Sequence, residues 1–321
     1  MYVVSAAAAG YSIYKVKKED DASKIPVMGV MGAFVFAAQM INFTIPGTGS
    51  SGHLCGGMLL SALLGPYAGF LTMIGVLFVQ CLMFADGGLL ALGCNIWNMA
   101  FYGCFIGSLL IWKLIMKNGV SKKKITFASI LGCVITLQLG AFSVTLETLA
   151  SGITKLSFGA FVSVMQPIHL AIGLVEGIIT ACVLVFVYEA RPELLWGVGG
   201  SSEKLKNRFS LKKTVAILAA AAVVIAGGLS LAASQYPDGL EWSIEKLTGD
   251  TELEADGEIY DKASQVQDTT AVLPDYSFKD SDSAAGTSVS GIAGALMVVA
   301  VCTAGCFIFR FFKNKKVKIS E

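Results

Sequence analysis

The two histidines of the sequence are the first candidates for chemistry, because imidazole is the commonest metal ligand in proteins. His53 follows residues 45–52, a run rich in glycine and proline that interrupts two apolar segments. Irregular backbone at membrane depth is tolerated only where protein covers it or where it lines a cavity. An imidazole at such a place can bind a borderline transition metal through one ring nitrogen. The alternative is a histidine that caps the end of a helix.

His169 and Glu176 form the second candidate pair, seven residues apart in an apolar run. A helix would place them on one face but about 10 Å apart along its axis, which is too far for both to bind one ion. An ionisable residue inside a membrane segment is costly and is therefore a functional candidate. Two interpretations stay open: a functional role such as a proton relay, and a hydrogen bond that fixes helix packing.

Asp86, Asn95 and Asn98 lie close together in residues 84–99. Asp86 begins an Asp-Gly-Gly turn that we expect on the same side of the membrane as His53. Its carboxylate could support His53 by a hydrogen bond, as carboxylates do for metal-binding histidines. It could instead cap the following helix, and this structural role is the one we favour.

No residue pattern points to an enzyme. Gly47 and Gly52 are spaced as in a phosphate-binding loop, but the required lysine is His53 and the following position is Leu54. We find no paired carboxylates and no Ser/His/Asp arrangement, so any ATP hydrolysis is expected on another chain. The eight cysteines fall in or beside apolar runs and are best explained as small buried hydrophobic residues.

Composition predicts the elements that must position these residues. The chain is 55% hydrophobic and 15% charged, with a mean hydropathy of +0.68, whereas soluble proteins carry about 25% charged residues. We predict an all-α, multi-pass membrane protein: a helical bundle of about seven segments plus a C-terminal two-helix hairpin. The predicted segments are 1–14, 25–45, 54–64, 68–84, 92–115, 125–149, 168–187, 214–233 and 291–309.

The basic residues predict the orientation. They occur in four clusters: Lys15, Lys17, Lys18 and Lys24; Lys117 and Lys122, Lys123 and Lys124; Arg191, Lys204, Lys206, Arg208, Lys212 and Lys213; and Arg310, Lys313, Lys315, Lys316 and Lys318. The positive-inside rule places all four in the cytoplasm. They share one side only if the short segment 54–64 counts as a crossing. We therefore predict a cell-membrane protein with its N-terminus outside and its C-terminus in the cytoplasm.

Residues 234–287 differ from the rest because they contain thirteen acidic residues and three lysines. We predict an extracytoplasmic loop that is largely solvated, with one short helix near residues 243–248. The chain then divides at about residue 205, into a membrane core (1–205) and a hairpin with an acidic loop (206–321).

Three motifs in order resemble one family: Gly-Thr-x3-Gly-His-Leu-x-Gly-Gly (47–57), Ala-Asp-Gly-Gly-x3-Leu-Gly-x-Asn-x2-Asn-Met (85–99) and His-x6-Glu-Gly-x-Ile-Thr (169–180). They resemble CbiM/NikM, the substrate-binding membrane components of energy-coupling-factor importers for cobalt and nickel. The resemblance covers roughly residues 1–200. Residues 236–242 resemble the Pro-Asp-Gly-Leu-Glu signature of the NikN-type accessory domain, and residues 273–276 resemble its second characteristic stretch.

The resemblance implies a ligand set. Family members begin Met-His, and their terminal amine, second amide nitrogen and second-residue imidazole bind the metal with the histidine that matches His53. Four nitrogen donors in a plane suit Ni²⁺ or Co²⁺. This sequence begins Met1-Tyr2, and its first segment is short of the length needed to span. We therefore expect about fifteen further residues upstream, with the remaining ligands in a Met-His start.

The resemblance also implies partners: a transmembrane coupling subunit (CbiQ/NikQ-like) and cytoplasmic ATPases (CbiO/NikO-like). Ni²⁺ or Co²⁺ would be the transported substrate, and no cofactor is expected. Two rival functions remain, an ion-coupled secondary transporter that uses His169 and Glu176, and an assembly subunit that does not transport. The sequence does not distinguish nickel from cobalt.

Overall fold

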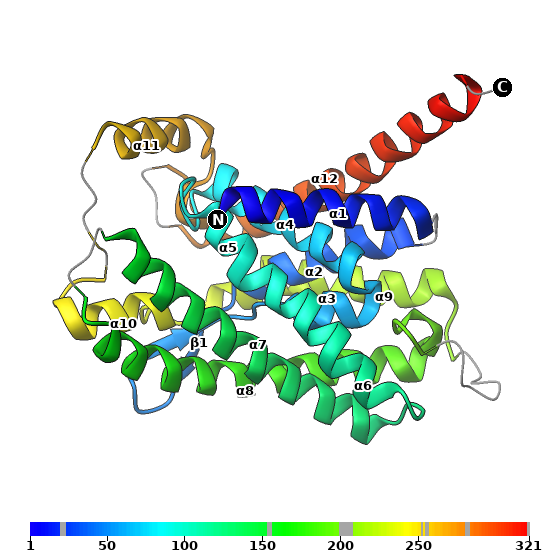
Figure 1. Cartoon of the computed structure of the whole chain (residues 1–321), viewed down its shortest axis with the longest axis horizontal. Coiled ribbons are helices and arrows are strands. Elements are labelled where there is room, and N and C mark those ends of the chain that lie inside the picture. The colour runs from blue at the N-terminus through cyan, green and yellow to red at the C-terminus, as the bar shows by residue number, and fades with distance from the viewer. Residues whose placement is uncertain are drawn as a thin grey trace.

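The computed structural model describes residues 1–19, 24–152, 156–198, 208–251, 253, 257–279 and 283–319, with side chains as far as Gly305. Its long helices run along the longest axis of the molecule and form one bundle (Figure 1). The helices of the membrane core are α1 (Tyr2–Glu19), α2 (Lys24–Gln39), α3 (Gly57–Leu64), α4 (Pro66–Phe84), α5 (Leu92–Asn95), η1 (Ile96–Trp112), α6 (Lys113–Met116), α7 (Lys122–Ser151), α8 (Phe158–Ala190) and η2 (Pro192–Leu194). Those that follow are α9 (Leu211–Gly227), η3 (Leu229–Ala232), α10 (Gly239–Thr248), α11 (Glu258–Thr270), η4 (Pro274–Tyr276) and α12 (Ala284–Ile319).

Within the described residues, five helical segments are long and apolar enough to cross a membrane: Pro66–Phe84, Leu92–Met116, Lys122–Ser151, Phe158–Ala190 and Ala284–Gly305. Large apolar side chains on their outer faces are exposed, among them Leu114, Ile178 and Leu296. Such faces need lipid to cover them. The prediction of an all-α, multi-pass membrane protein is confirmed. The number of nine segments stays a prediction.

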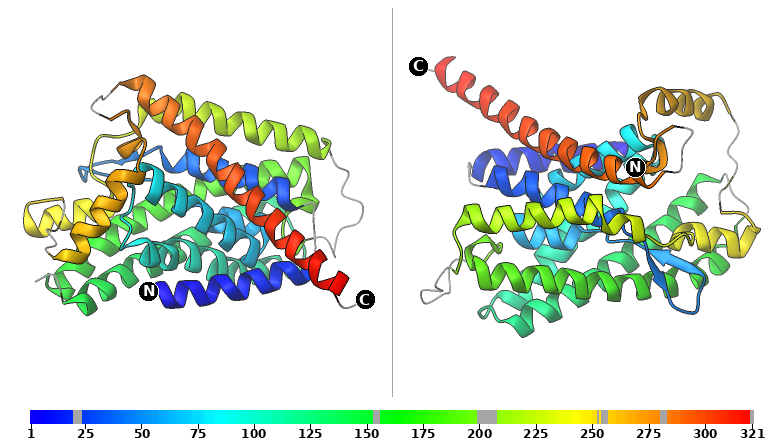
Figure 2. Two further views of the ribbon diagram at one scale, coloured as in Figure 1. Left: turned by 90° about the horizontal axis from the view of Figure 1, so that it is seen from above. Right: turned by 180° about the vertical axis from the view of Figure 1, so that it is seen from behind.

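The bundle has two chemically different ends, visible at opposite sides of Figures 1 and 2. The basic end carries the turn between α6 and α7 and the residues that follow α8. The opposite end, which we call the hairpin end, carries a small β-hairpin, the turn after α4, and helices α10 and α11. The predicted division at about residue 205, with Lys204 and Lys206, lies outside the described residues.

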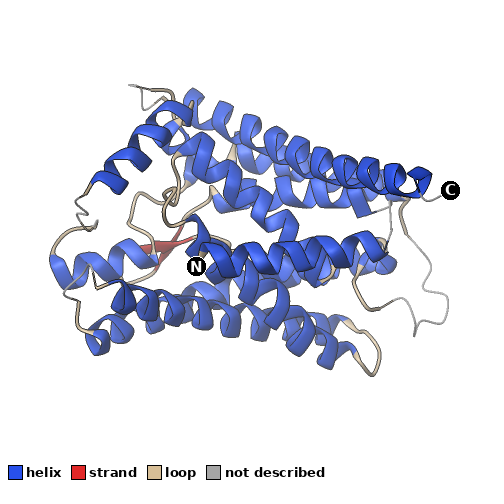
Figure 3. Cartoon of the chain, turned by 45° about the horizontal axis from the view of Figure 1, so that its top comes forward, coloured by secondary structure: helices blue, strands red, loops and turns tan. Residues whose placement is uncertain are grey.

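The β-hairpin was not predicted. We expected a membrane segment over 25–45, but α2 ends at Gln39, and β1 (Phe43–Ile45) pairs antiparallel with β2 (Ser50–Gly52). Figure 3 shows the pair against an otherwise helical chain. Gly47 and Gly49 both have φ +77°, a left-handed conformation that glycine adopts without steric cost. The turn glycines therefore allow the chain to reverse just before His53.

The segment 54–64 is not a spanning helix. Its helical part, α3, has eight residues and is therefore only about 12 Å long. All eight are buried, and Gly57 packs against Gly103 of η1 so closely that a Cβ on Gly57 would lie 2.8 Å from the Met99 carbonyl oxygen. The helix ends at the basic end, where the Trp196 amide donates to the Ala62 carbonyl at 2.8 Å. From the hairpin end to the basic end the chain is thus formed by the non-helical residues 53–56 and the half-length helix α3.

Several other segments are longer than predicted, α1 and α8 among them. Helix α1 extends to Glu19 rather than stopping near residue 14, and it includes lysines in its last turn. Helix α8 begins at Phe158 instead of residue 168 and continues through Pro167. Neighbouring helices in a membrane bundle can satisfy the backbone group that a proline leaves unpaired. Helix α8 therefore includes Pro167 in its interior.

The acidic loop contains more structure than predicted. In place of one short helix it has α10, α11 and the turn η4. Asp238 caps α10 in a full capping box with Glu241, and Ser243 and Ile244 on its inner face are buried. The Tyr276 ring stacks on Phe84 of the core, with centroids 4.7 Å apart. The loop is therefore docked on the hairpin end, while residues 252, 254–256 and 280–282 lie outside the described residues.

Candidate metal site

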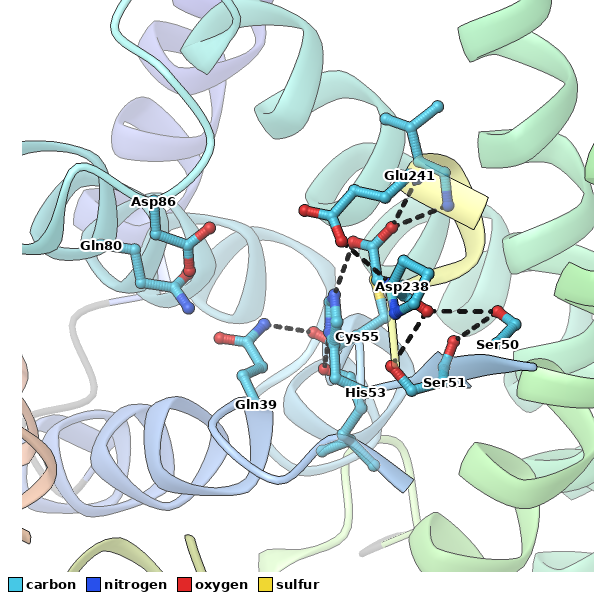
Figure 4. A network of polar contacts seen from close by, with 12 residues as sticks. Gln39, Ser50, Ser51, His53, Cys55, Gln80, Asp86, Asp238 and Glu241 are labelled. Atoms are coloured by element: carbon cyan, nitrogen blue, oxygen red, sulfur yellow. Dashed lines mark hydrogen bonds and ion pairs between the residues drawn. The ribbon is translucent and has the colours of Figure 1, made fainter. Parts of the chain in front are cut away.

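His53 lies between β2 and α3 at the hairpin end, with 32% of its side chain exposed. Its Nε2 atom is 4.0 Å from Oδ2 of Asp238, a residue 185 positions later in the sequence. Its Nδ1 atom is 3.3 Å from the carbonyl oxygen of Leu54. Figure 4 shows the imidazole and the Asp238 carboxylate facing each other. One ring nitrogen is therefore directed toward the acidic loop.

Glu176 fixes the backbone that follows His53. The side chain is 1% exposed, and its two oxygens accept hydrogen bonds from the amides of Cys55 at 3.1 Å and Gly56 at 2.9 Å. From the other side, Gln39 Nε2 donates to the Cys55 carbonyl at 2.9 Å. Helices α2 and α8 thus hold the same peptide, so Glu176 acts on the candidate ligand through the chain.

Gly56 makes this arrangement possible. It has φ +84°, and a Cβ at this position would lie 2.4 Å from Cγ1 of Val35. Only glycine combines the left-handed conformation with such a close approach. The segment that follows His53 therefore requires the two glycines after Cys55.

His169 lies nearer to the candidate site than we expected. We predicted that it would be far from His53 in space as well as in sequence. Its Nδ1 donates to the Met165 carbonyl of its own helix at 2.8 Å, which leaves Nε2 on the side of α10. A Cβ on Gly239 would lie 3.3 Å from that Nε2 atom. Helix α10 packs on α8 at Gly239, a contact between distant parts of the sequence, and this packing places His169 beside the start of α10.

The polar residues of 84–99 hold other elements in place. The Asp86 carboxylate accepts a hydrogen bond from the Tyr276 hydroxyl, and the helix that starts at Leu92 has no side-chain cap. The expected cap by Asp86 is thus wrong, while a structural role is supported. Asn95 donates to the Gly87 carbonyl at 3.0 Å, which closes the turn. Asn98 donates to Glu147 of α7 at 2.8 Å.

The acidic loop is attached to the hairpin that directly precedes His53. The Ser51 amide donates to the Pro237 carbonyl at 2.8 Å, and the Ser51 hydroxyl donates to the Tyr236 carbonyl at 2.8 Å. Trp242 Nε1 donates to the carbonyl of Thr48 in the turn, at 3.0 Å. These bonds fix the register of the loop against β2, and they bring Asp238 opposite His53.

Nothing in our reading of single residues identified Asp238, Gln39 or Cys55 as part of the site. The Pro-Asp-Gly stretch (237–239) marked Asp238 as a residue of interest, but nothing in the sequence connects this stretch to His53. Across the described parts of the chain, no group of three or more His, Cys, Asp or Glu side chains is placed to hold an ion. The nitrogen ligands implied by a Met-His start stay a prediction.

Two protein-family models match successive parts of the chain. Residues 1–194 match the family model described as CbiM, the cobalt uptake substrate-specific transmembrane region. Residues 212–311 match the PDGLE domain. A putative fused nickel transport protein NikMN of Archaeoglobus fulgidus is 34% identical over 304 residues, which cover 94% of this chain and 91% of that protein.

Two further similarities are more distant. A probable fused nickel transport protein LarMN of Lactiplantibacillus plantarum is 30% identical over 241 residues, covering 73% of this chain and 70% of that protein. The crystal structure of a truncated transition metal transporter superposes with a TM-score of 0.51 at 30% identity, covering 58% of this chain and 92% of that one. The chain therefore belongs to the CbiM family of cobalt and nickel transport components, and it carries a PDGLE domain behind the family's transmembrane region.

Proposed function

We propose that this chain is the substrate-binding component of an ATP-driven nickel or cobalt importer, and that it captures the ion at His53 on the extracytoplasmic side. The observation that carries the proposal is the placement of His53. It directly follows the β-hairpin, and Glu176 and Gln39 hold the backbone at Cys55 and Gly56 just after it, at the end of the bundle opposite the basic end. A partly exposed imidazole on a rigid segment suits the capture of a borderline metal ion.

ATP hydrolysis belongs to partner chains in this proposal. The sequence lacks a phosphate-binding loop with its lysine, so the energy must come from ATPases that act through a transmembrane coupling subunit. Their movement would reorient the loaded chain so that the ion faces the cytoplasm. A proton relay through His169 and Glu176 finds no support, because the Glu176 oxygens bind backbone amides and His169 Nδ1 donates to its own helix.

Replacement of His53 tests the proposal directly. In vesicles that contain the chain with its coupling subunit and ATPases, His53→Ala should lower uptake of ⁶³Ni²⁺ or ⁵⁷Co²⁺ at trace concentration by at least about a hundredfold, because the protein ligand itself is lost. His169→Ala is the comparison: its effect should appear in thermal stability instead. Uptake by His53→Ala at the wild-type rate, or uptake without the ATPases, would refute the proposal.

The orientation gives a separate prediction. Cysteines replacing Gln265 in α11 and Lys123 at the start of α7 lie at opposite ends of the bundle, both on exposed positions. In a background without native cysteines, a membrane-impermeant maleimide added to intact cells should label position 265 and not position 123. Labelling after lysis should be equal at the two positions. The reverse pattern in intact cells would place His53 in the cytoplasm.

A further inference from the structure

The two carboxylate oxygens of Asp238 have different surroundings. Oδ1 accepts hydrogen bonds from the amides of Leu240 at 2.8 Å and Glu241 at 2.9 Å, and so caps helix α10. Oδ2 points the other way and lies 4.0 Å from Nε2 of His53. Asp238 is about one-third exposed, so water and ions can reach the space between the two side chains. The helix cap uses one oxygen and leaves the other for a second partner.

The position of Asp238 is fixed on both sides. Before it, the Pro237 carbonyl accepts the Ser51 amide of β2, two residues ahead of His53. After it, Gly239 packs on α8, where a Cβ would lie 2.8 Å from Cδ1 of Ile172. The β-hairpin therefore anchors the residue before Asp238 as well as the chain that leads into His53. Each residue of the Pro-Asp-Gly stretch has a distinct part: the proline carbonyl anchors, the aspartate faces His53, and the glycine permits close packing.

The separation of the two atoms fits one bound ion. For a first-row ion such as zinc, the metal–nitrogen distance to histidine is about 2.0–2.1 Å and the metal–oxygen distance to aspartate about 2.0–2.2 Å. Two donors 4.0 Å apart can thus both reach a single ion that sits between them. A direct hydrogen bond between the same atoms would need a much shorter distance, about 2.7–2.9 Å for a charged pair.

We propose that Asp238 binds the incoming ion together with His53, so that the PDGLE region supplies one ligand of the capture site. This inference rests on the proposed function, because it takes the ion at His53 as given. A carboxylate adds a negative charge next to the neutral imidazole and compensates part of the charge of a divalent cation. The PDGLE region then takes part in ion binding directly, and Asp238 influences which ions are captured.

The competing explanation is that Asp238 only caps α10. Asparagine and serine are both good N-cap residues, so Asp238→Asn and Asp238→Ser keep the cap while they remove the charged oxygen that faces His53. Glu245→Gln provides the matched control, because it removes one negative charge from the same helix without touching the cap. If the cap is the whole role of Asp238, all three variants will bind metal equally well.

The experiment is a Co²⁺ titration of the full chain purified in detergent, followed by the visible absorption of bound Co²⁺ and by thermal unfolding. We expect Asp238→Asn and Asp238→Ser to weaken Co²⁺ binding at least about tenfold and to change the absorption bands. Both should unfold at the wild-type temperature in the absence of metal. Glu245→Gln should match the wild type in all three measurements, and His53→Ala should bind no Co²⁺.

Three outcomes would overturn the inference. The first is wild-type affinity and wild-type absorption bands in both Asp238 variants, which would leave the proposed function intact if His53→Ala still fails to bind. The second is an equal loss in Glu245→Gln, which would indicate a general effect of charge. The third is wild-type binding by His53→Ala, which would remove the assignment of the ion to His53 itself and with it the proposed capture site.

Discussion

Replacing Glu176 with alanine is expected to destabilise the protein more than any other substitution of a charged side chain discussed above. The change leaves the amides of Cys55 and Gly56 without acceptors in a region where Glu176 itself is 1% exposed. An unsatisfied buried donor costs about 1–3 kcal/mol, so the pair costs about 2–6 kcal/mol. Because these amides belong to the second and third residues after His53, binding of Co²⁺ should be lost together with stability.

Thermal unfolding and Co²⁺ titration of the purified variant measure the two effects. Glu176→Gln should fall between the wild type and Glu176→Ala, since its side chain offers one acceptor oxygen and turns an N–H group toward the second amide. Glu189→Gln is the control on the same helix. Its carboxylate pairs with Lys122 at the surface, where ion pairs contribute little, so it should behave as the wild type.

A stable Glu176→Ala protein that binds Co²⁺ as tightly as the wild type would contradict the role of Glu176 in holding the Cys55 and Gly56 amides. A variant that is stable but binds no Co²⁺ would instead make Glu176 a direct ligand. The structure argues against this second result, because both carboxylate oxygens already accept backbone hydrogen bonds. The two measurements together therefore separate a positioning role from a binding role.

Hydropathy was enough to predict the class of protein and the approximate place of most long helices, because lipid requires about 20 apolar residues in each span. It failed where length and irregular backbone mattered. Helix α3 is half the length of a span, yet it is wholly buried, so its hydropathy resembles that of a membrane segment. The β-hairpin was missed because three-residue strands leave no alternating pattern.

The candidate site could be predicted only in part for a related reason. His53 stood out locally, as the histidine of an interrupted apolar region. Asp238 and Glu176 are 185 and 123 positions away in the sequence. The Pro237 carbonyl accepts from the Ser51 amide, and the Glu176 carboxylate accepts from the Cys55 and Gly56 amides, which brings both residues to the His53 segment. No local spacing encodes such contacts. Glu176 was recognised as a candidate, but its role depended on which amides it meets.

The docking of the PDGLE region depends on Tyr276 in the same non-local way. Its ring stacks on Phe84 at 4.7 Å and lies 6.1 Å from Phe36. Its hydroxyl donates to Asp86 and accepts from Gln80 Nε2 at 3.1 Å. Asp275 and Tyr276 have φ of 48° and 57°, a conformation that costs non-glycine residues about 1–2 kcal/mol each. The contacts of the ring and the hydroxyl must offset that cost.

Tyr276→Ala is therefore expected to release the PDGLE loop from the core. Loss of a fully buried aromatic side chain typically costs about 3–5 kcal/mol; Tyr276 is partly buried, so we expect its loss to cost less than that, on top of the cost of the strained turn. Limited proteolysis of the purified chain should cut between α11 and α12 much faster than in the wild type. Tyr276→Phe keeps the stacked ring and loses the hydroxyl contacts, so it should lie between the two. Tyr236→Ala, at an exposed ring of the same loop, should change nothing.

Because the same loop carries Asp238, Tyr276→Ala should also weaken Co²⁺ binding. Wild-type proteolysis of Tyr276→Ala would show that the bonds to the β-hairpin hold the loop without this ring.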